Sequence, residues 1–214
     1  MKLVCIDAEY TGEHAFTTLV SLGLVGLDGR ELYLTLNDYD CDQVTKWLKD
    51  NVLTLIDESQ SVSSKEAYQR LREWLEEYGA GERIHLVSAG KGPDIILLNQ
   101  LYHHACPERK YFHNLYCLPD YLNHTEHFDL NTLFRVVGFD SGRGRESFLG
   151  REVSPDRHNA LYDARIVRDC LLELLANPLL KGFQGRADDA EPGNLQSMET
   201  YSATDRSIRV ESGD

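Results

Sequence analysis

Asp7 and Glu9 stand two residues apart at the end of an apolar segment, in the stretch LVCIDAEYTG. Side chains at positions i and i+2 of a strand point to the same face, so both carboxylates can project from the C-terminal end of a first strand over residues 2–7. Adjacent carboxylates repel each other unless a cation lies between them, and hard oxygen ligands suit Mg²⁺ or Mn²⁺. The pair therefore predicts a divalent-metal site, with a solvated strand end as the alternative.

Two further acids lie where helices can bring them to the same edge of a sheet. Asp94 falls in the first turn of an expected helix over residues 92–105, a position that the helix dipole also favours without any chemistry. Asp163 lies near the start of an expected helix over residues 159–176, between apolar neighbours. The Asp-Ala-Glu tripeptide alone carries little information, because it recurs at 189–191 in a polar stretch.

His158 precedes Asp163 by five positions. On a regular helix this separation turns the two side chains about 140° apart, so they cannot share a site if both are mid-helix. They can share one if the helix begins after His158, with His158 on the entry turn and Asp163 on the inner face. A surface or hydrogen-bonded histidine is the alternative.

Together, three blocks of the sequence resemble the DEDDh family of 3′-to-5′ exonucleases. The blocks are DAEYTG, the aspartate of GPDIILL, and RHNALYDAR, which are similar to D-x-E-x-T-G, a central aspartate and H-x-A-x-x-D-A. The resemblance spans about the first 180 residues. Within the family, KWLKDNVL is most similar to small bacterial exoribonucleases, whereas SAGKGPD departs from the common central form N-x-x-F-D.

The resemblance implies an α/β fold of the RNase H-like kind, in which a mixed sheet starts with three antiparallel strands, continues with parallel strands and is flanked by helices. It implies two divalent cations, Mg²⁺ or Mn²⁺, and His158 as the general base. The implied reaction hydrolyses phosphodiester bonds at the 3′ end of single-stranded RNA or DNA and releases mononucleotides, with RNA slightly favoured. A homodimer is expected from dimeric relatives. The implied metal ligands are Asp7, Glu9, Asp94 and Asp163.

Residues beside these blocks are candidates for binding the substrate. Tyr10 can stack on the terminal base, with packing at the rim as the alternative. Lys91, at a helix N-terminus, can contact a phosphate or stand free on the surface. The loop before His158 is rich in arginine and can guide the strand. The candidates are Tyr10, Thr11, Gly12, Lys91, Arg143 and Arg145.

The hydrophobic pattern predicts the elements that position these residues. Asp28 and Gly29 join two apolar runs and predict a hairpin after the first strand. A short strand is expected over residues 83–89, and residues 106–128 are expected to be irregular. Helices are expected over residues 41–53, 63–81, 92–105, 129–138 and 159–176.

Length and composition indicate one folded domain. The chain has 214 residues, of which 42% are hydrophobic and 27% are charged. Apolar periodicity ends near Lys181, and the remainder is polar. We therefore expect an exonuclease domain over residues 1–182 and a disordered tail over residues 183–214.

Charge and cysteine usage exclude several classes of protein. A net charge of −13 argues against a large non-specific nucleic-acid surface, so contacts with a 3′ end should be local and supported by metal ions. The five cysteines are never spaced as CxxC, which argues against a zinc site or a disulfide framework. No apolar run approaches the roughly 20 residues that cross a bilayer, and we expect a cytoplasmic protein.

Two other functions stay open on the sequence. One is a non-catalytic module that binds nucleic acid on the same fold, which the presence of Asp7, Glu9, His158 and Asp163 disfavours. The other is a phosphodiesterase that uses the same residues on dinucleotides or short oligonucleotides. Activity as a function of strand length separates the second alternative from the exonuclease.

Overall fold

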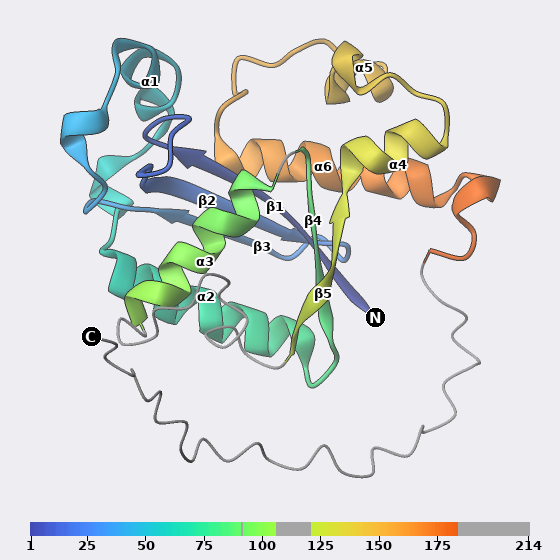
Figure 1. The fold of residues 1–214 in the computed structure, drawn as a ribbon, viewed down its shortest axis with the longest axis horizontal. Coiled ribbons are helices and arrows are strands. Elements are labelled where there is room, and N and C mark those ends of the chain that lie inside the picture. The colour runs from blue at the N-terminus through green and yellow to red at the C-terminus, as the bar shows by residue number, and fades with distance from the viewer. Residues whose placement is uncertain (91, 106–120, 184–214) are drawn as a thin grey trace, which may run out of the picture. The chain divides into compact units, whose positions relative to one another are not determined.

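The computed structural model describes residues 1–90, 92–105 and 121–183, and these residues contain a five-stranded mixed sheet of order β3-β2-β1-β4-β5 (Figure 1). β1 pairs antiparallel with β2, and β2 pairs antiparallel with β3. β4 and β5 continue the sheet in parallel pairing. The predicted α/β class, with an antiparallel start and parallel strands, is confirmed. The strands are β1 Lys2–Tyr10, β2 Leu19–Gly26, β3 Glu31–Thr35, β4 Ile84–Ser88 and β5 Leu122–Asp129.

Helices cover both faces of the sheet. α2 and α3 lie on one face, where their apolar residues pack on β1, β2 and β4, and α4 and α6 lie on the other (Figure 1). The sheet is therefore buried on both sides, as near-continuous apolar strands such as β2 require. The helices in the described part of the chain are α1 Lys46–Asn51, α2 Ser64–Gly79, α3 Pro93–Ala105, α4 Leu130–Val136, α5 Arg145–Phe148 and α6 Ala160–Leu175.

Glycines allow two features of the sheet that a side chain would obstruct. Gly29 adopts a φ of +89° in the turn between β2 and β3, which confirms the predicted hairpin. Gly23, in the middle of β2, lies against the start of α6. A Cβ atom at Gly23 would stand 2.3 Å from the carbonyl oxygen of Ala160, so only glycine permits this approach of helix and strand.

Two segments differ from the prediction. The single helix expected over residues 41–53 is divided into a 3-10 turn, the short helix α1 and a second 3-10 turn, because the hydroxyl of Thr45 caps the amide of Leu48 and begins a new helix there. The second difference is β5, a strand in a segment expected to be irregular. Among the described strands, β5 pairs only with β4, and it carries polar residues at most positions. Its sequence therefore lacks the apolar alternation that identifies a strand.

Residues 184–214, which make up nearly all of the predicted tail, lie outside the described part of the chain. Among the described helices, none has the length and apolar character needed to span a membrane.

Candidate metal centre

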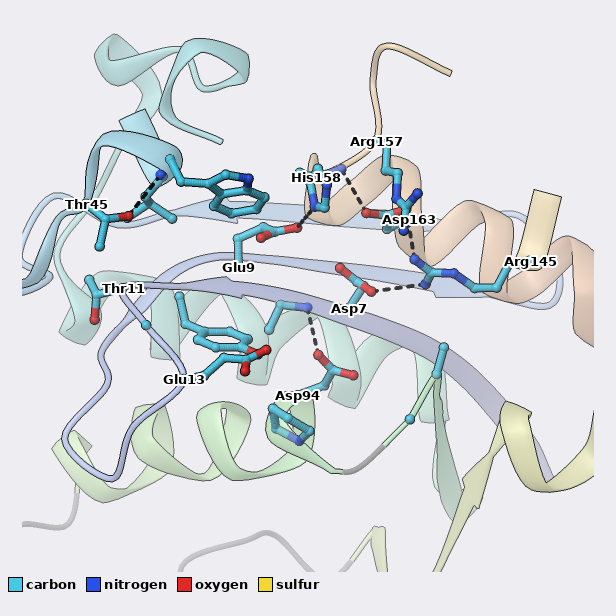
Figure 2. Close-up of a pocket in the computed structure, with 18 of the residues that line it drawn as sticks. Asp7, Glu9, Thr11, Glu13, Thr45, Asp94, Arg145, Arg157, His158 and Asp163 are labelled. Carbon is cyan, nitrogen blue, oxygen red and sulfur yellow. Dashed lines mark hydrogen bonds and ion pairs between the residues drawn. The ribbon is translucent and has the colours of Figure 1, made fainter. Parts of the chain in front are cut away.

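A cavity of about 620 Å³ opens where β1, the start of α3 and the start of α6 meet (Figure 2). All five residues predicted to carry the chemistry line this cavity, although they come from three segments far apart in the sequence. They are Asp7, Glu9, Asp94, His158 and Asp163.

The geometry of β1 explains why its carboxylates are available. The strand is longer than predicted and continues to Tyr10, but its parallel pairing with β4 ends at Cys5. Beyond that point, the backbone edge facing α3 needs another hydrogen-bond partner. Asp94 supplies it, because the amide of Ala8 donates to Asp94 Oδ1 at 3.1 Å. The central acid is thus fixed against the strand that carries Asp7.

The start of α6 positions the second pair of residues. Asn159 caps the helix, as its Oδ1 accepts hydrogen bonds from the amides of Leu161 and Tyr162. His158 lies just before the cap with a φ of +74°, and its backbone amide donates to Asp163 Oδ2 at 3.0 Å. The prediction that the helix begins after His158, with Asp163 facing inward, is confirmed.

His158 closes one side of the cavity. Its Nδ1 lies 3.9 Å from Glu9 Oε1, and its ring and the Trp47 ring make a T-shaped contact at a centroid distance of 5.0 Å. One ligand atom each from Glu9, His158 and Asp163 lie within 4.8 Å of one another, a spacing that can hold a metal ion. Two carboxylates and an imidazole are donors that suit Mn²⁺ and Mg²⁺.

Arg145 reaches the acids from the opposite side (Figure 2). It begins the four-residue helix α5, and its guanidinium donates to Asp7 Oδ1 at 3.3 Å and to Asp163 Oδ1 at 3.1 Å. The sequence predicted a substrate contact for Arg145. The structure places its guanidinium on two of the predicted metal ligands, where it joins β1 to α6.

The four acids of the cavity repel one another, and few positive charges among the described residues lie near them. Burial, followed by repulsion from Asp94 and Asp163, raises the pKa of Asp7 well above its usual range. The same two causes raise the pKa of Glu9 to about 8. Burial raises the pKa of Asp94 to about 7 and also raises that of Asp163, although Arg145 acts against both shifts. One guanidinium does not compensate four carboxylates, of which two are buried and two are mostly covered, so the residues fit divalent cations.

These shifts predict how the metal-free protein responds to pH. A carboxyl group whose pKa is higher in the folded state binds protons there that the unfolded chain does not, so the free energy of unfolding falls as pH rises from about 4 to about 8. In EDTA, we expect the melting temperature to be higher at about pH 6 than at about pH 8. Saturating Mn²⁺ should raise the melting temperature at about pH 8 and so remove most of this difference. Equal melting temperatures in EDTA would contradict the prediction.

Some of the predicted substrate contacts line the cavity and others do not. Tyr10 and Gly12 line the cavity, as does Thr11, whose buried hydroxyl is occupied by Thr17, Thr18 and Gln43 and so supports the β1–β2 loop. Arg143 does not line the cavity, and its guanidinium lies over the ring of Phe139 at 5.5 Å. Lys91 lies outside the described residues.

Several cavity residues were not predicted as site residues. Trp47 is the most prominent, with 53% of its surface exposed. Leu48 and Val52 are the buried residues of α1 and its C-terminal cap, so Trp47 lies off the apolar face of that segment. A large aromatic residue out of phase with the apolar period is a signal that could have identified it. The others include Glu13, Thr45 and Asn131.

Comparisons with known proteins add information on the fold. No protein-family model matches the chain, and no curated protein matches it by sequence. Among solved structures, it is similar to S. pombe Pop2p in its Mg²⁺- and Mn²⁺-bound form, with a TM-score of 0.50 and 15% sequence identity. The match covers 87% of this chain and 86% of that chain. The comparison thereby confirms the predicted RNase H-like α/β fold.

Proposed function

We propose that the chain is a metal-dependent 3′-to-5′ exonuclease that hydrolyses phosphodiester bonds in single-stranded nucleic acid, with RNA slightly favoured over DNA. The observation that carries the proposal is the convergence of four acids and one histidine on a single cavity. The order of the three sequence blocks and the likeness to a fold known with Mg²⁺ and Mn²⁺ bound support it. The DEDDh subgroup and the homodimer stay predictions from the resemblance.

Two divalent cations held by Asp7, Glu9, Asp94 and Asp163 would neutralise the buried acids and stabilise the charge that develops on the phosphate. His158 would accept the proton of the attacking water. Burial lowers the pKa of His158, which favours the neutral imidazole that can act as a base. The bond from its backbone amide to Asp163 holds the backbone of His158 beside the acids.

The surroundings of the cavity favour a strand end over a long duplex surface. The chain carries a net charge of −13, and the arginines at the cavity, Arg145 and Arg157, stand beside acids or next to His158. Phosphate binding away from the cavity should therefore be weak. Tyr10 and Trp47 offer aromatic surface to unstacked bases, which tolerates any base sequence.

The test is a degradation time course on matched RNA and DNA strands labelled at the 5′ end, in Mn²⁺ or Mg²⁺ and again in EDTA. We expect a ladder that shortens from the 3′ end in metal and no cleavage in EDTA. Strands from two to about 20 nucleotides should all be shortened. Loss of rate on all but the shortest strands would favour the dinucleotide phosphodiesterase, and binding without cleavage would favour the non-catalytic module. Cleavage that persists in EDTA would contradict the proposal.

A further inference from the structure

Behind Asp94, on the side away from the cavity, lies a second hydrogen-bonded group. Ser88 ends β4 and is completely buried. Hydrogen bonding by its side chain is one of the influences that lower the pKa of Asp94 against the effect of burial. Its Oγ lies 2.9 Å from Nε2 of His127 on the neighbouring strand β5. A continuous chain of polar groups therefore runs from His127 through Ser88 to Asp94, and from Asp94 to the amide of Ala8.

The donors in this chain can be assigned from the chemistry of the groups. A serine hydroxyl has one proton and two acceptor lone pairs. If that proton is donated to the carboxylate of Asp94, Ser88 Oγ must accept from His127, which then carries its proton on Nε2. Burial lowers the pKa of His127, which favours the neutral ring that this arrangement requires.

A serine, a histidine and an aspartate in contact also make up the usual nucleophilic triad, but the burial of Ser88 excludes that role. The serine has no exposed surface and does not line the cavity, so no substrate atom reaches its hydroxyl. The acid that its hydroxyl influences is Asp94, whose pKa it lowers by hydrogen bonding. Its effect must therefore be exerted through that acid.

β5 also holds the residue Gly90, which precedes the helix that carries Asp94. The carboxylate of Asp129, two residues after His127, accepts a hydrogen bond from the amide of Gly90 at 2.8 Å. Gly90 has a φ of +95° and precedes Asp94 by four residues. The edge strand thus contacts the end of β4 at Ser88 and the segment after it at Gly90, one on each side of Ala89.

We propose that Ser88 and His127 are positioning residues that orient the carboxylate of Asp94 between the amide of Ala8 and the cavity. The central block SAGKGPD departs from the form N-x-x-F-D. In this chain, Ser88 on β4 and His127 on β5 would orient Asp94 in its place. The part of the inference that concerns metal binding rests on the proposed function. The orientation of Asp94 itself does not.

The variants separate the hydrogen bonds from packing. Ser88→Ala removes the hydroxyl, and His127→Phe keeps a ring but removes its donor. His127→Gln restores an N–H at a similar reach. His85→Phe is the matched control, because His85 lies on β4 next to the same edge strand, stacks on Phe128 and contacts none of the acids of the cavity.

The first measurement is Mn²⁺ binding by calorimetry on variants with unchanged circular dichroism. Loss of a group that orients a metal ligand typically weakens binding about 10- to 100-fold, so we expect about 10-fold or more for Ser88→Ala and less for His127→Phe, whose ring is partly exposed to water. His127→Gln should recover most of the loss. His85→Phe should bind Mn²⁺ like the unaltered chain.

The second measurement needs no metal. The amide proton of Ala8 bonds to Asp94 Oδ1, so its nuclear magnetic resonance shift in EDTA reports the position of that carboxylate. We expect the resonance to move in Ser88→Ala and His127→Phe, to return with His127→Gln and to stay in His85→Phe.

The two measurements distinguish the failure of this inference from the failure of the proposed function. Unchanged Mn²⁺ affinity and an unmoved Ala8 resonance in Ser88→Ala would overturn the inference while leaving a metal-binding wild type. Equal losses in His85→Phe, or no recovery with His127→Gln, would also overturn it. A wild-type chain that binds no Mn²⁺ but whose Ala8 resonance moves in the variants would overturn the proposed function and leave the positioning role supported.

Discussion

Asp163→Asn protein is expected to lose about 10³-fold or more of its kcat on a single-stranded substrate, about 4 kcal/mol of transition-state stabilisation. Asp163 is 2% exposed and faces the cavity, and both of its oxygens are used within the site. An amide has nearly the same shape but no charge with which to hold a divalent cation. The measurement is the rate of 3′ shortening, together with Mn²⁺ binding, which should weaken in parallel.

Asp169→Asn is the matched control for this prediction. Asp169 lies on the same helix six residues later, where it pairs with Arg151 away from the cavity. Its replacement should leave both rate and Mn²⁺ affinity close to those of the unaltered chain. If Asp163→Asn kept full activity, or if Asp169→Asn lost as much, the assignment of the acids as metal ligands would be wrong.

His158→Asn is expected to lower kcat about 10²- to 10⁴-fold, the range that general-base catalysis contributes. Asparagine is suited to this position because it tolerates the positive φ of His158, and the backbone amide can still bond to Asp163. Activity of the unaltered chain should rise with pH through the lowered pKa of His158, since the neutral ring is the base. That limb of the pH profile should be absent in the variant.

Metal affinity decides between two roles for the same histidine. As a base, His158 contributes little to Mn²⁺ binding, and His158→Asn should bind the ion nearly as well as the unaltered chain. As a ligand beside Glu9 and Asp163, which the spacing of their atoms allows, its loss should weaken binding. His14→Asn, in the exposed β1–β2 loop, is the control for a general effect of replacing histidine. Unchanged kcat together with unchanged Mn²⁺ affinity in His158→Asn would exclude both roles.

The parts of the fold that the sequence predicted are those with local signals. The hairpin at Gly29, the start of α6 after His158 and the position of Asp94 in the first turn of α3 follow from turn, capping and helix rules acting within a few residues. The edge strand β5 was missed because an edge strand needs only one partner and can be polar. Its place in the sheet is decided by β4, more than 30 residues earlier.

In the candidate site, too, local signals predicted some residues and long-range contacts decided the others. Asp7 and Glu9 could be placed on one face from their spacing alone, but nothing local predicts that Arg145 joins Asp7 to Asp163. That contact spans 138 residues on one side and 18 on the other. The support of Asp94 by Ser88 depends likewise on a neighbouring strand. Spacing identifies the reacting groups, whereas tertiary structure decides which neutral and basic groups surround them.

Gly23 has a consequence for how the centre tolerates sequence change. It is the register partner of Asp7 on β2, and its α-carbon also lies against the first residue of α6, the helix that carries Asp163. The distance between Asp7 and Asp163 therefore depends on direct contact between the backbones of β2 and α6, and not on the size of apolar side chains between them. One added methyl group at Gly23, where β2 meets α6, would push the helix away from the strand and widen the gap between the acids.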